Sequence, residues 1–205
     1  MEPNDKIFTP DEMQVLVCDA LSDGEFKVAI PSATHRKTFL IADPHFGDER
    51  IRRYENRPFD DVEQMDAALI SRWNGVVSPW DVVYVLGDFG ADGYEQKVLN
   101  QLNGEKYLIK GNHDQKSNGE YRKFGFREVY DYPIIVDHFW ILSHDALYVN
   151  ENMPYANLFG HVHNSPIFKD YSSQHYCVCV ERIDYTPIDF EFVKKHIQEA
   201  AGKER

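Results

Sequence analysis

Side chains that bind divalent metal ions recur in this sequence directly after short apolar runs. The apolar run at 39–42 is followed by Asp43 and His45, and the run at 82–86 is followed by Asp88. Aspartate, histidine and asparagine offer oxygen and nitrogen donors to such ions, so this pattern predicts a metal site. The candidate ligands are Asp43, His45, Asp88, Asn112, His144, His161 and His163.

The number of candidate ligands exceeds what one four-coordinate ion can use, so two ions are expected, with one carboxylate bridging them. Mixed nitrogen and oxygen ligands suit manganese, iron or zinc. Calcium takes oxygen ligands alone, and magnesium keeps several waters. We therefore expect two divalent metal ions as cofactors, drawn from manganese, iron, zinc and nickel, with manganese favoured.

The elements that must position these ligands follow a regular order. Apolar runs at 39–42, 82–86 and 107–109 predict buried strands, and the segments at 61–76 and 94–102 predict helices between them. Strands joined in this way run parallel through right-handed crossovers, and ligands bind where their carboxyl ends meet. Further along, the sequence predicts strands at 133–137, 139–143, 158–159 and 176–180 and a closing helix at 187–201.

Five short motifs occur in order along the chain, and together they carry a resemblance. The motifs are Asp43-x-His45, Gly87-Asp88, Gly111-Asn112-His113-Asp114, His144 and Gly160-His161-x-His163. Over residues 39–180 the chain resembles the calcineurin-like metallophosphoesterases, and an ordered set of motifs is far more specific than a single one. Two further segments, which are similar to the compact bacterial and phage-type subgroup, are His45-Phe46-Gly47 and Arg57-Pro58-Phe59.

The resemblance implies an α/β fold, a four-layer α/β/β/α sandwich in which two mixed β-sheets are flanked by helices. It also implies the chemistry, in which a metal-bound hydroxide attacks the phosphate. His113 would be the catalytic residue that stabilises the phosphoryl oxygens or protonates the leaving oxygen. By motif position, the ligands of one ion would be Asp43, His45 and His163, and those of the other Asn112, His144 and His161, with Asp88 between the ions.

The chain also departs from one branch of this superfamily. Protein serine/threonine phosphatases carry an aspartate three residues after the bridging one, where this chain has Ala91. They also carry Glu-Arg after the Asn-His pair, where this chain has Asp114-Gln115. A protein phosphatase is therefore disfavoured. The group that orients His113 stays open between Asp92 and Asp114.

Several arginines lie close after the first motif along the chain. A guanidinium group can clamp a substrate phosphate through two parallel hydrogen bonds, so Arg53 and Arg57 are candidate substrate-binding residues. The alternative is an exposed helix face on which these arginines pair with Glu49 and Glu55. The sequence leaves both possibilities open.

The composition limits the partners that the protein can have. The chain has 205 residues, 42% of them apolar, and a formal net charge of −12. Such a charge repels long nucleic acid and anionic membranes unless basic residues are locally concentrated. We therefore expect a small phosphoester substrate, no membrane partner and a cytoplasmic location.

The beginning of the chain differs in pattern from the remainder. Residues 1–37 are expected to form an N-terminal appendage with a helix at 11–21 and a strand at 26–30, and residues 38–205 a metallophosphoesterase domain. Near the other end, Cys177 and Cys179 lie in a strand-like stretch and are expected to be reduced, with a role in packing.

The leading hypothesis from these observations is a metal-dependent phosphoesterase that hydrolyses a small phosphodiester or a nucleotide. Two alternatives stay open. The first is a nuclease on short nucleic acid, which would need a basic groove near the arginine segment. The second is a non-catalytic, metal-bound scaffold for partner binding. His113 argues against the scaffold, because a scaffold has no need of a histidine that is not a ligand.

Overall fold

The computed structural model describes residues 17–20, 26–29, 36–150, 152–165 and 172–203. Contacts divide the chain into two units, Met1–His35 and Arg36–Arg205, and the predicted boundary after residue 37 lies beside this division. In the first unit, β1 (Val17–Ala20) pairs antiparallel with β2 (Phe26–Ala29).

The helix predicted at 11–21 is therefore wrong where the structure describes it, because residues 17–20 form a strand. Residues 11–16 lie outside the described residues. The spacing of the apolar residues fits a helix face, but pairing with a neighbouring strand overrides such a local pattern. The strand predicted at 26–30 is confirmed over Phe26–Ala29.

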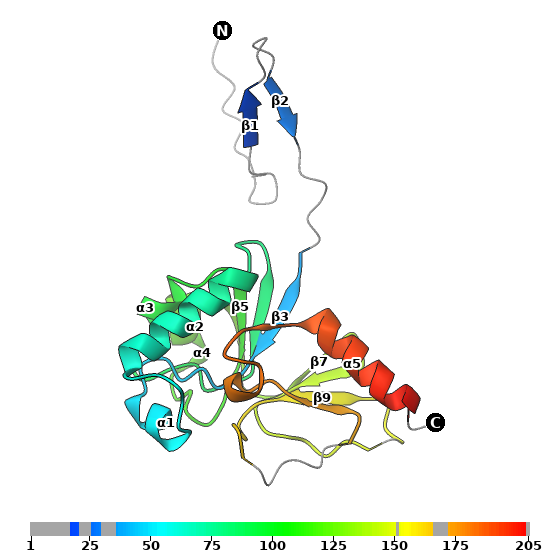
Figure 1. Ribbon diagram of the computed structural model, residues 1–205. Helices are drawn as coiled ribbons and strands as arrows, with labels where there is room; N and C mark the ends of the chain where they lie inside the picture. The colour runs from blue at the N-terminus through cyan, green and yellow to red at the C-terminus, as the bar shows by residue number, and fades with distance from the viewer. Residues whose placement is uncertain (1–16, 21–25, 30–35, 151, 166–171, 204–205) are drawn as a thin grey trace. The chain divides into compact units, whose positions relative to one another are not determined.

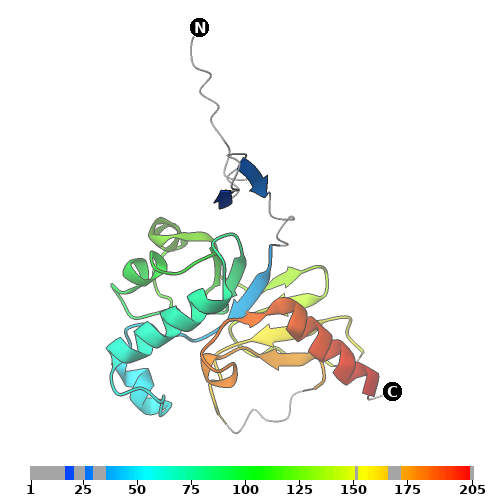
Figure 2. The ribbon, with the colours of Figure 1, turned by 45° about the horizontal axis from the view of Figure 1, so that its top comes forward.

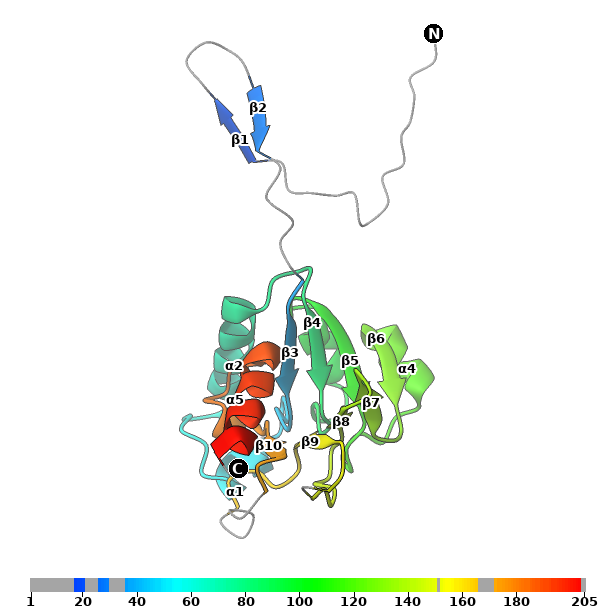
Figure 3. The same ribbon diagram turned by 90° about the vertical axis from the view of Figure 1, so that its right-hand side faces the viewer.

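The larger unit contains a five-stranded sheet in the order β11-β3-β4-β5-β6. Figure 1 labels two of its strands, β3 and β5. Its four parallel strands stand side by side in Figure 3, and β11 pairs antiparallel with β3. The predicted βαβαβ unit is therefore confirmed. The strands are β3 (Thr38–Ile41), β4 (Val82–Val85), β5 (Glu105–Ile109), β6 (Phe126–Tyr130) and β11 (Ile188–Asp189).

The second sheet has the order β10-β9-β8-β7, with β7 antiparallel to β8 and the other pairs parallel. Both sheets are therefore mixed. The strands are β7 (Ile134–Val136), β8 (Trp140–Leu142), β9 (Ala156–Phe159) and β10 (His175–Cys177), and a short 3-10 helix (Val180–Arg182) comes next.

Helices flank the sheets. Side-chain caps fix two helix starts, since Asp61 accepts the N–H of Gln64 at the start of α2 and Ser117 forms a capping box with Glu120 at the start of α4. In Figure 2, α2 lies across the first sheet, and α5 contacts β3, β10 and β11. The helices are α1 (Glu49–Tyr54), α2 (Val62–Val76), α3 (Glu95–Leu99), α4 (Asn118–Phe124) and α5 (Phe190–Lys203).

Alternation along β3 divides the core into two layers. Phe39 and Ile41 pack with the core on the side of α2, whereas Leu40 packs between the two sheets with Leu142 and Leu158. These two layers confirm the predicted fold class of two mixed sheets flanked by helices. In the part of the chain that the structure describes, no helix is both long enough and apolar enough to cross a membrane.

Candidate functional site

The candidate ligands lie at the carboxyl ends of strands from both sheets. Asp43 and His45 follow β3, and Asp88 follows β4. His144 follows β8 and His161 follows β9, so the second sheet contributes imidazoles to the same site. The predicted convergence at the strand ends is therefore observed, because the parallel strands of each sheet end at a common edge.

The first donor group consists of Asp43, His45 and His163, each of which offers one ligand atom within 4.8 Å of the others. Nε2 of His163 lies 3.9 Å from Oδ1 of Asp43. Asp43 is fully buried and His45 is 3% exposed. This group could hold one divalent ion, shielded from solvent.

The second donor group consists of Asp88, His144 and His161, whose ligand atoms also lie within 4.8 Å of one another. Nε2 of His144 lies 3.0 Å from Nδ1 of His161, 3.0 Å from Oδ1 of Asn112 and 3.5 Å from Oδ2 of Asp88. The same Oδ2 is 3.6 Å from Nε2 of His45. The carboxylate of Asp88 therefore lies between the two groups.

Polar atoms without partners test whether these residues fit a metal. Oδ1 of Asp43 and Nε2 of His45 are buried, and neither has a hydrogen-bond partner among the described residues. Buried polar atoms nearly always have a partner, so these two require one. Both belong to the first donor group, and a divalent cation among its donors would satisfy them. The residues therefore fit a metal ion.

The backbone at the site adopts a conformation that most residues avoid. A residue other than glycine in the left-handed region costs about 1–3 kcal/mol and persists only where the surrounding structure enforces it. Such strain clusters at functional sites. The candidate ligands with positive φ are Asp43 (57°), His45 (49°), Asp88 (53°), His161 (67°) and His163 (46°).

Glycines let the ligand loops approach one another closely. A Cβ atom on Gly111 would lie 2.2 Å from Oδ1 of Asp88, and one on Gly160 would lie 2.6 Å from Oδ2 of Asp43. Side chains at these two positions would displace the carboxylates, so the glycines in the motifs are required by space.

Hydrogen bonds to the imidazole rings of two candidate ligands determine which ring nitrogen would face a bound ion. Nδ1 of His144 lies 2.9 Å from the carbonyl oxygen of Leu86, and Nδ1 of His163 lies 3.1 Å from Oε1 of Glu181. These oxygens can only accept, so we assign the proton to Nδ1 in both rings. Nε2 of each ring is then left with a lone pair for a metal.

Burial and neighbouring charges shift the pKa values of the first donor group in different directions. Burial raises the pKa of Asp43 to about 6, although His144 and His163 lower it in part. Burial lowers the pKa of His45 well below its usual value, and the charge of Arg57 adds to this effect. Burial also lowers the pKa of His163, but the hydrogen bond to Glu181 and the charge of Asp43 outweigh it, so the net shift is upward.

His113 lies at the surface beside the first donor group. Its ring centroid is 5.2 Å from that of His45, in an edge-to-face arrangement. Its backbone N–H donates to Oδ1 of Asp88 at 2.8 Å, so the residue also helps to hold the central carboxylate. The ring is therefore beside the first donor group and exposed to solvent, while the backbone contacts Asp88.

The two carboxylates considered as partners of His113 have other partners. Asp114 is buried and accepts the backbone N–H groups of Asp88, Phe89 and Gly111, so it ties the loops after β4 and β5 together. Asp92 is exposed and pairs with Lys116. These contacts assign neither carboxylate to His113.

The structure gives Arg57 a different role from the predicted substrate contact. Its side chain is completely buried, and its guanidinium group donates to the carbonyl oxygens of Asp43 and Pro44, each at 2.8 Å, and to Glu181. Arg53 is exposed and its Nε donates to Oε1 of Glu49 at 2.7 Å. The substrate contact of Arg53 stays a prediction.

Glu181 is a site residue that the sequence reasoning missed. Its side chain is 4% exposed and contacts both His163 and Arg57. A signal was present, because Glu181 directly follows the strand predicted at 176–180, as the candidate ligands follow theirs.

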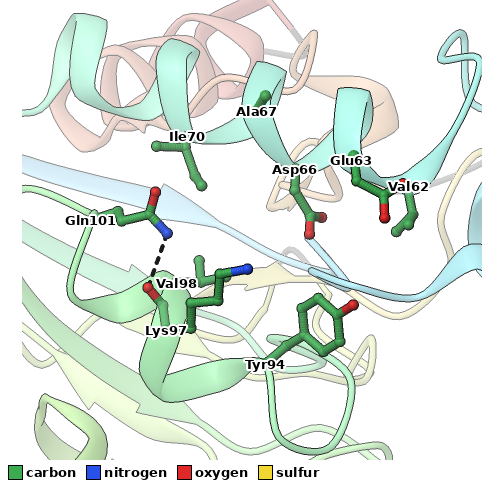
Figure 4. Close-up of a pocket in the computed structure, with 9 residues that line it drawn as sticks. All are labelled: Val62, Glu63, Asp66, Ala67, Ile70, Tyr94, Lys97, Val98 and Gln101. Atoms are coloured by element: carbon green, nitrogen blue, oxygen red, sulfur yellow. Dashed lines mark hydrogen bonds between the residues drawn. The ribbon is translucent and has the colours of Figure 1, made fainter.

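Asp66 is a second residue that the sequence reasoning missed, and it contacts the loop that follows β3. Its Oδ1 accepts the backbone N–H of Gly47 at 3.0 Å. It lines a pocket of about 230 Å³ between α2 and α3. Figure 4 shows Asp66 in this pocket together with Tyr94 and Lys97. Burial raises the pKa of Asp66 to about 6. The residues lining this pocket include none of the candidate ligands.

The two cysteines predicted to have a packing role lie near the site. Cys177 and Cys179 are free and buried, with their sulfur atoms 3.2 Å apart. They pack with Phe159 and Val162 on the second sheet. Their position agrees with the predicted packing role.

Comparisons with known proteins point to one family. The model of the calcineurin-like phosphoesterase family matches residues 36–197. An uncharacterized protein of Methanocaldococcus jannaschii is 36% identical over 171 residues, which cover 80% of this chain and 92% of that protein. The gene 66 protein of Mycobacterium phage L5 is 35% identical over 82 residues, covering 38% of this chain and 39% of that protein. The crystal structure of a protein of unknown function from Aquifex aeolicus is 27% identical, with a TM-score of 0.63, and the match covers 78% of this chain and 99% of that chain.

Proposed function

Because the chain belongs to the calcineurin-like phosphoesterase family, as its five motifs predicted, we propose that it hydrolyses phosphate esters with two divalent metal ions. The observation that carries this proposal is the pair of donor groups with the carboxylate of Asp88 between them. When bound, two such ions lower the pKa of a water and neutralise charge on the phosphate.

Each donor group would hold one of the two ions. Asp43, His45 and His163 would hold one ion in a buried setting. The second ion would be held by the other group, where His161 is 46% exposed and substrate has access. Asn112 joins this second group through its side-chain oxygen, which lies beside Nε2 of His144.

His113 is the residue proposed to act on the substrate itself. Its neighbour Asn112 directs its side chain to the second donor group, while the His113 ring lies against His45 and open to solvent. From there a protonated imidazole would stabilise the phosphoryl oxygens or donate a proton to the leaving oxygen. Neither action requires His113 to be a ligand.

The proposed substrate is a small phosphodiester or a nucleotide. A nuclease would need a basic groove, and the arginine segment offers little free positive charge for one. Arg57 is buried, and Arg52 and Arg53 both pair with Glu49. Together with the net charge of −12, this favours small substrates over long nucleic acid.

Hydrolysis of bis(p-nitrophenyl) phosphate tests the proposal. We expect turnover with added manganese and loss of turnover with a chelator, restored by excess manganese. A panel of phosphomonoesters, cyclic nucleotides and dinucleotides, each with manganese, nickel, zinc and magnesium in turn, then defines the substrate class. If a folded protein with bound metal cleaves none of them, the scaffold alternative replaces the enzyme.

A further inference from the structure

We propose that Glu181 and Arg57 act as a positioning pair for the first donor group. In this proposal Glu181 sets which nitrogen of His163 faces the ion, and Arg57 holds the loop that carries Asp43 and His45. The proposal rests on the proposed function only in requiring that the first donor group binds an ion.

The contacts of Glu181 carry the first half of the proposal. Its Oε1 lies 3.1 Å from Nδ1 of His163, and it accepts from Nε and Nη2 of Arg57 at 2.9 and 2.7 Å. A carboxylate is only an acceptor, so Nδ1 of His163 carries the proton. Nε2 then presents its lone pair to the donor group, on the side where Oδ1 of Asp43 lies 3.9 Å away.

The remaining donors of Arg57 carry the second half. They bind the carbonyl oxygens of Asp43 and Pro44, inside a loop whose two candidate ligands both have positive φ. The guanidinium group therefore links the loop after β3 to Glu181, which is 124 residues from Arg57 in the sequence. A planar group with several fixed donors can make all these bonds at once, whereas a lysine could not.

The second donor group has a weaker contact that corresponds to the one between Glu181 and His163, and this contact supplies a matched control. There, Nε2 of His161 lies 3.7 Å from Oδ1 of Asp145, and both side chains are substantially exposed, at 46% and 72%. Solvent screens such a contact. A change at Asp145 should therefore have much less effect on metal binding than the same change at Glu181.

The test is a titration of the metal-free protein with Mn²⁺, followed by calorimetry, for the wild type, Glu181→Gln and Asp145→Asn. Changes to the outer partners of metal-binding histidines weaken affinity about 10–100-fold. We expect Glu181→Gln to weaken one of two Mn²⁺ sites by this factor and leave the other within about threefold, and Asp145→Asn to change both by less than about threefold. Two unchanged sites, or two equally weakened sites, in Glu181→Gln would overturn the proposal.

A second measurement separates positioning from general support of the fold. Nitrogen-15 NMR of the metal-free protein reports which nitrogen of His163 is protonated, and wild-type protein should show the proton on Nδ1. In Glu181→Gln, the amide can turn its NH₂ group toward the ring, so a mixture of tautomers is expected. A ring that keeps a single Nδ1–H tautomer in this variant would contradict the proposal.

Loss of one partner leaves a buried charge unpaired, so a variant that removes both charges is included. Arg57→Met/Glu181→Gln should fold, as judged by circular dichroism, and still show the selective loss at one Mn²⁺ site. Wild-type Mn²⁺ binding in this folded variant would also overturn the proposal. The two proposals can fail separately. If Glu181→Gln loses Mn²⁺ affinity at one site only, but the wild type hydrolyses no phosphoester, the proposed enzymatic function is contradicted and the positioning pair stands.

Discussion

The two donor groups are built from the same residue types but differ in their surroundings. In the first group Asp43 and His45 are buried and His163 is largely buried. The buried pair Arg57 and Glu181 contacts this group. The second group opens to solvent through Asn112 and His161. Under the proposed function, this difference would allow the first group to retain an ion and the second to bring an ion into contact with a substrate.

The groups are also similar in one respect, since each combines both sheets. His163 follows β9 of the second sheet but joins Asp43, which follows β3 of the first. His144 follows β8 of the second sheet but joins Asp88, which follows β4 of the first. Neither group can form unless the two sheets pack together, so the site depends on the core between them.

Removal of the shared carboxylate is expected to have the largest effect, because it would change both donor groups. In Asp88→Ala we expect metal content to fall from two ions per chain toward none, because Oδ2 of Asp88 lies near His45 of one group and His144 of the other. Activity should fall by more than about 10³-fold, because the electrostatic support of the transition state is lost. Elemental analysis of the purified variant checks the metal content.

Asp92→Ala is the matched control for this substitution, since Asp92 is an exposed carboxylate that pairs with Lys116 rather than with a candidate ligand. It should keep both ions. Retention of two ions by Asp88→Ala would remove Asp88 from its proposed place between the groups and make the two sites independent.

A smaller effect is expected from His113→Gln, which separates catalysis from metal binding. General acid catalysis contributes about 10²–10⁴-fold, so kcat should fall by this factor for an alkyl ester. The loss should shrink for p-nitrophenol, which leaves readily without a proton, and metal content should stay at two. Equal losses for both leaving groups would indicate stabilisation of the phosphoryl oxygens instead, and lost metal would show that His113 is a ligand.

The pH dependence of metal binding tests the protonation of the first donor group. The raised pKa of Asp43, about 6, and the raised pKa of His163 mean that both residues hold protons in mildly acidic solution. An ion must displace these protons, whereas His45 has a lowered pKa and is already neutral. Mn²⁺ affinity should therefore fall as the pH drops through 6, by about tenfold per pH unit for each proton displaced.

Calorimetry of the metal-free protein in two buffers of different ionisation enthalpy measures the protons released per ion. Release should be greater at pH 5.5 than at pH 8. Equal release at the two values would show that Asp43 and His163 do not hold protons in the metal-free site.

The proximity of the candidate ligands could be predicted from the sequence, because their positions depend on a simple rule. Parallel strands end at one edge, so polar residues after Ile41 and Val85 had to lie close together. The close approach of the loops was also predictable, because Gly111 and Gly160 lack side chains. The left-handed backbone conformation of Asp43 could not be predicted, because contacts with segments distant in the sequence impose it.

The errors also have physical causes. The helix α4 and the strand β6 were not predicted, since both are short and stand between stronger patterns. The closing helix begins at Phe190 and not at 187, because Ile188 and Asp189 pair with β3 first. The burial of Arg57 could not be predicted, because sequence spacing does not show whether an arginine faces solvent or the protein interior.

The smallest effect is expected from Arg53→Ala, which tests the part of the arginine segment that lies outside the positioning pair. Arg53 is 74% exposed and pairs with Glu49, which Arg52 also contacts, so its loss removes one of two partners from a surface carboxylate. Screened surface pairs of this kind contribute little. We expect kcat and KM for bis(p-nitrophenyl) phosphate and for a dinucleotide to change by less than about twofold, with no change in Mn²⁺ binding. A clear rise in KM for the dinucleotide alone would show that Arg53 leaves Glu49 to bind a second phosphate, and would make the exposed arginine a substrate contact while the buried one serves the metal.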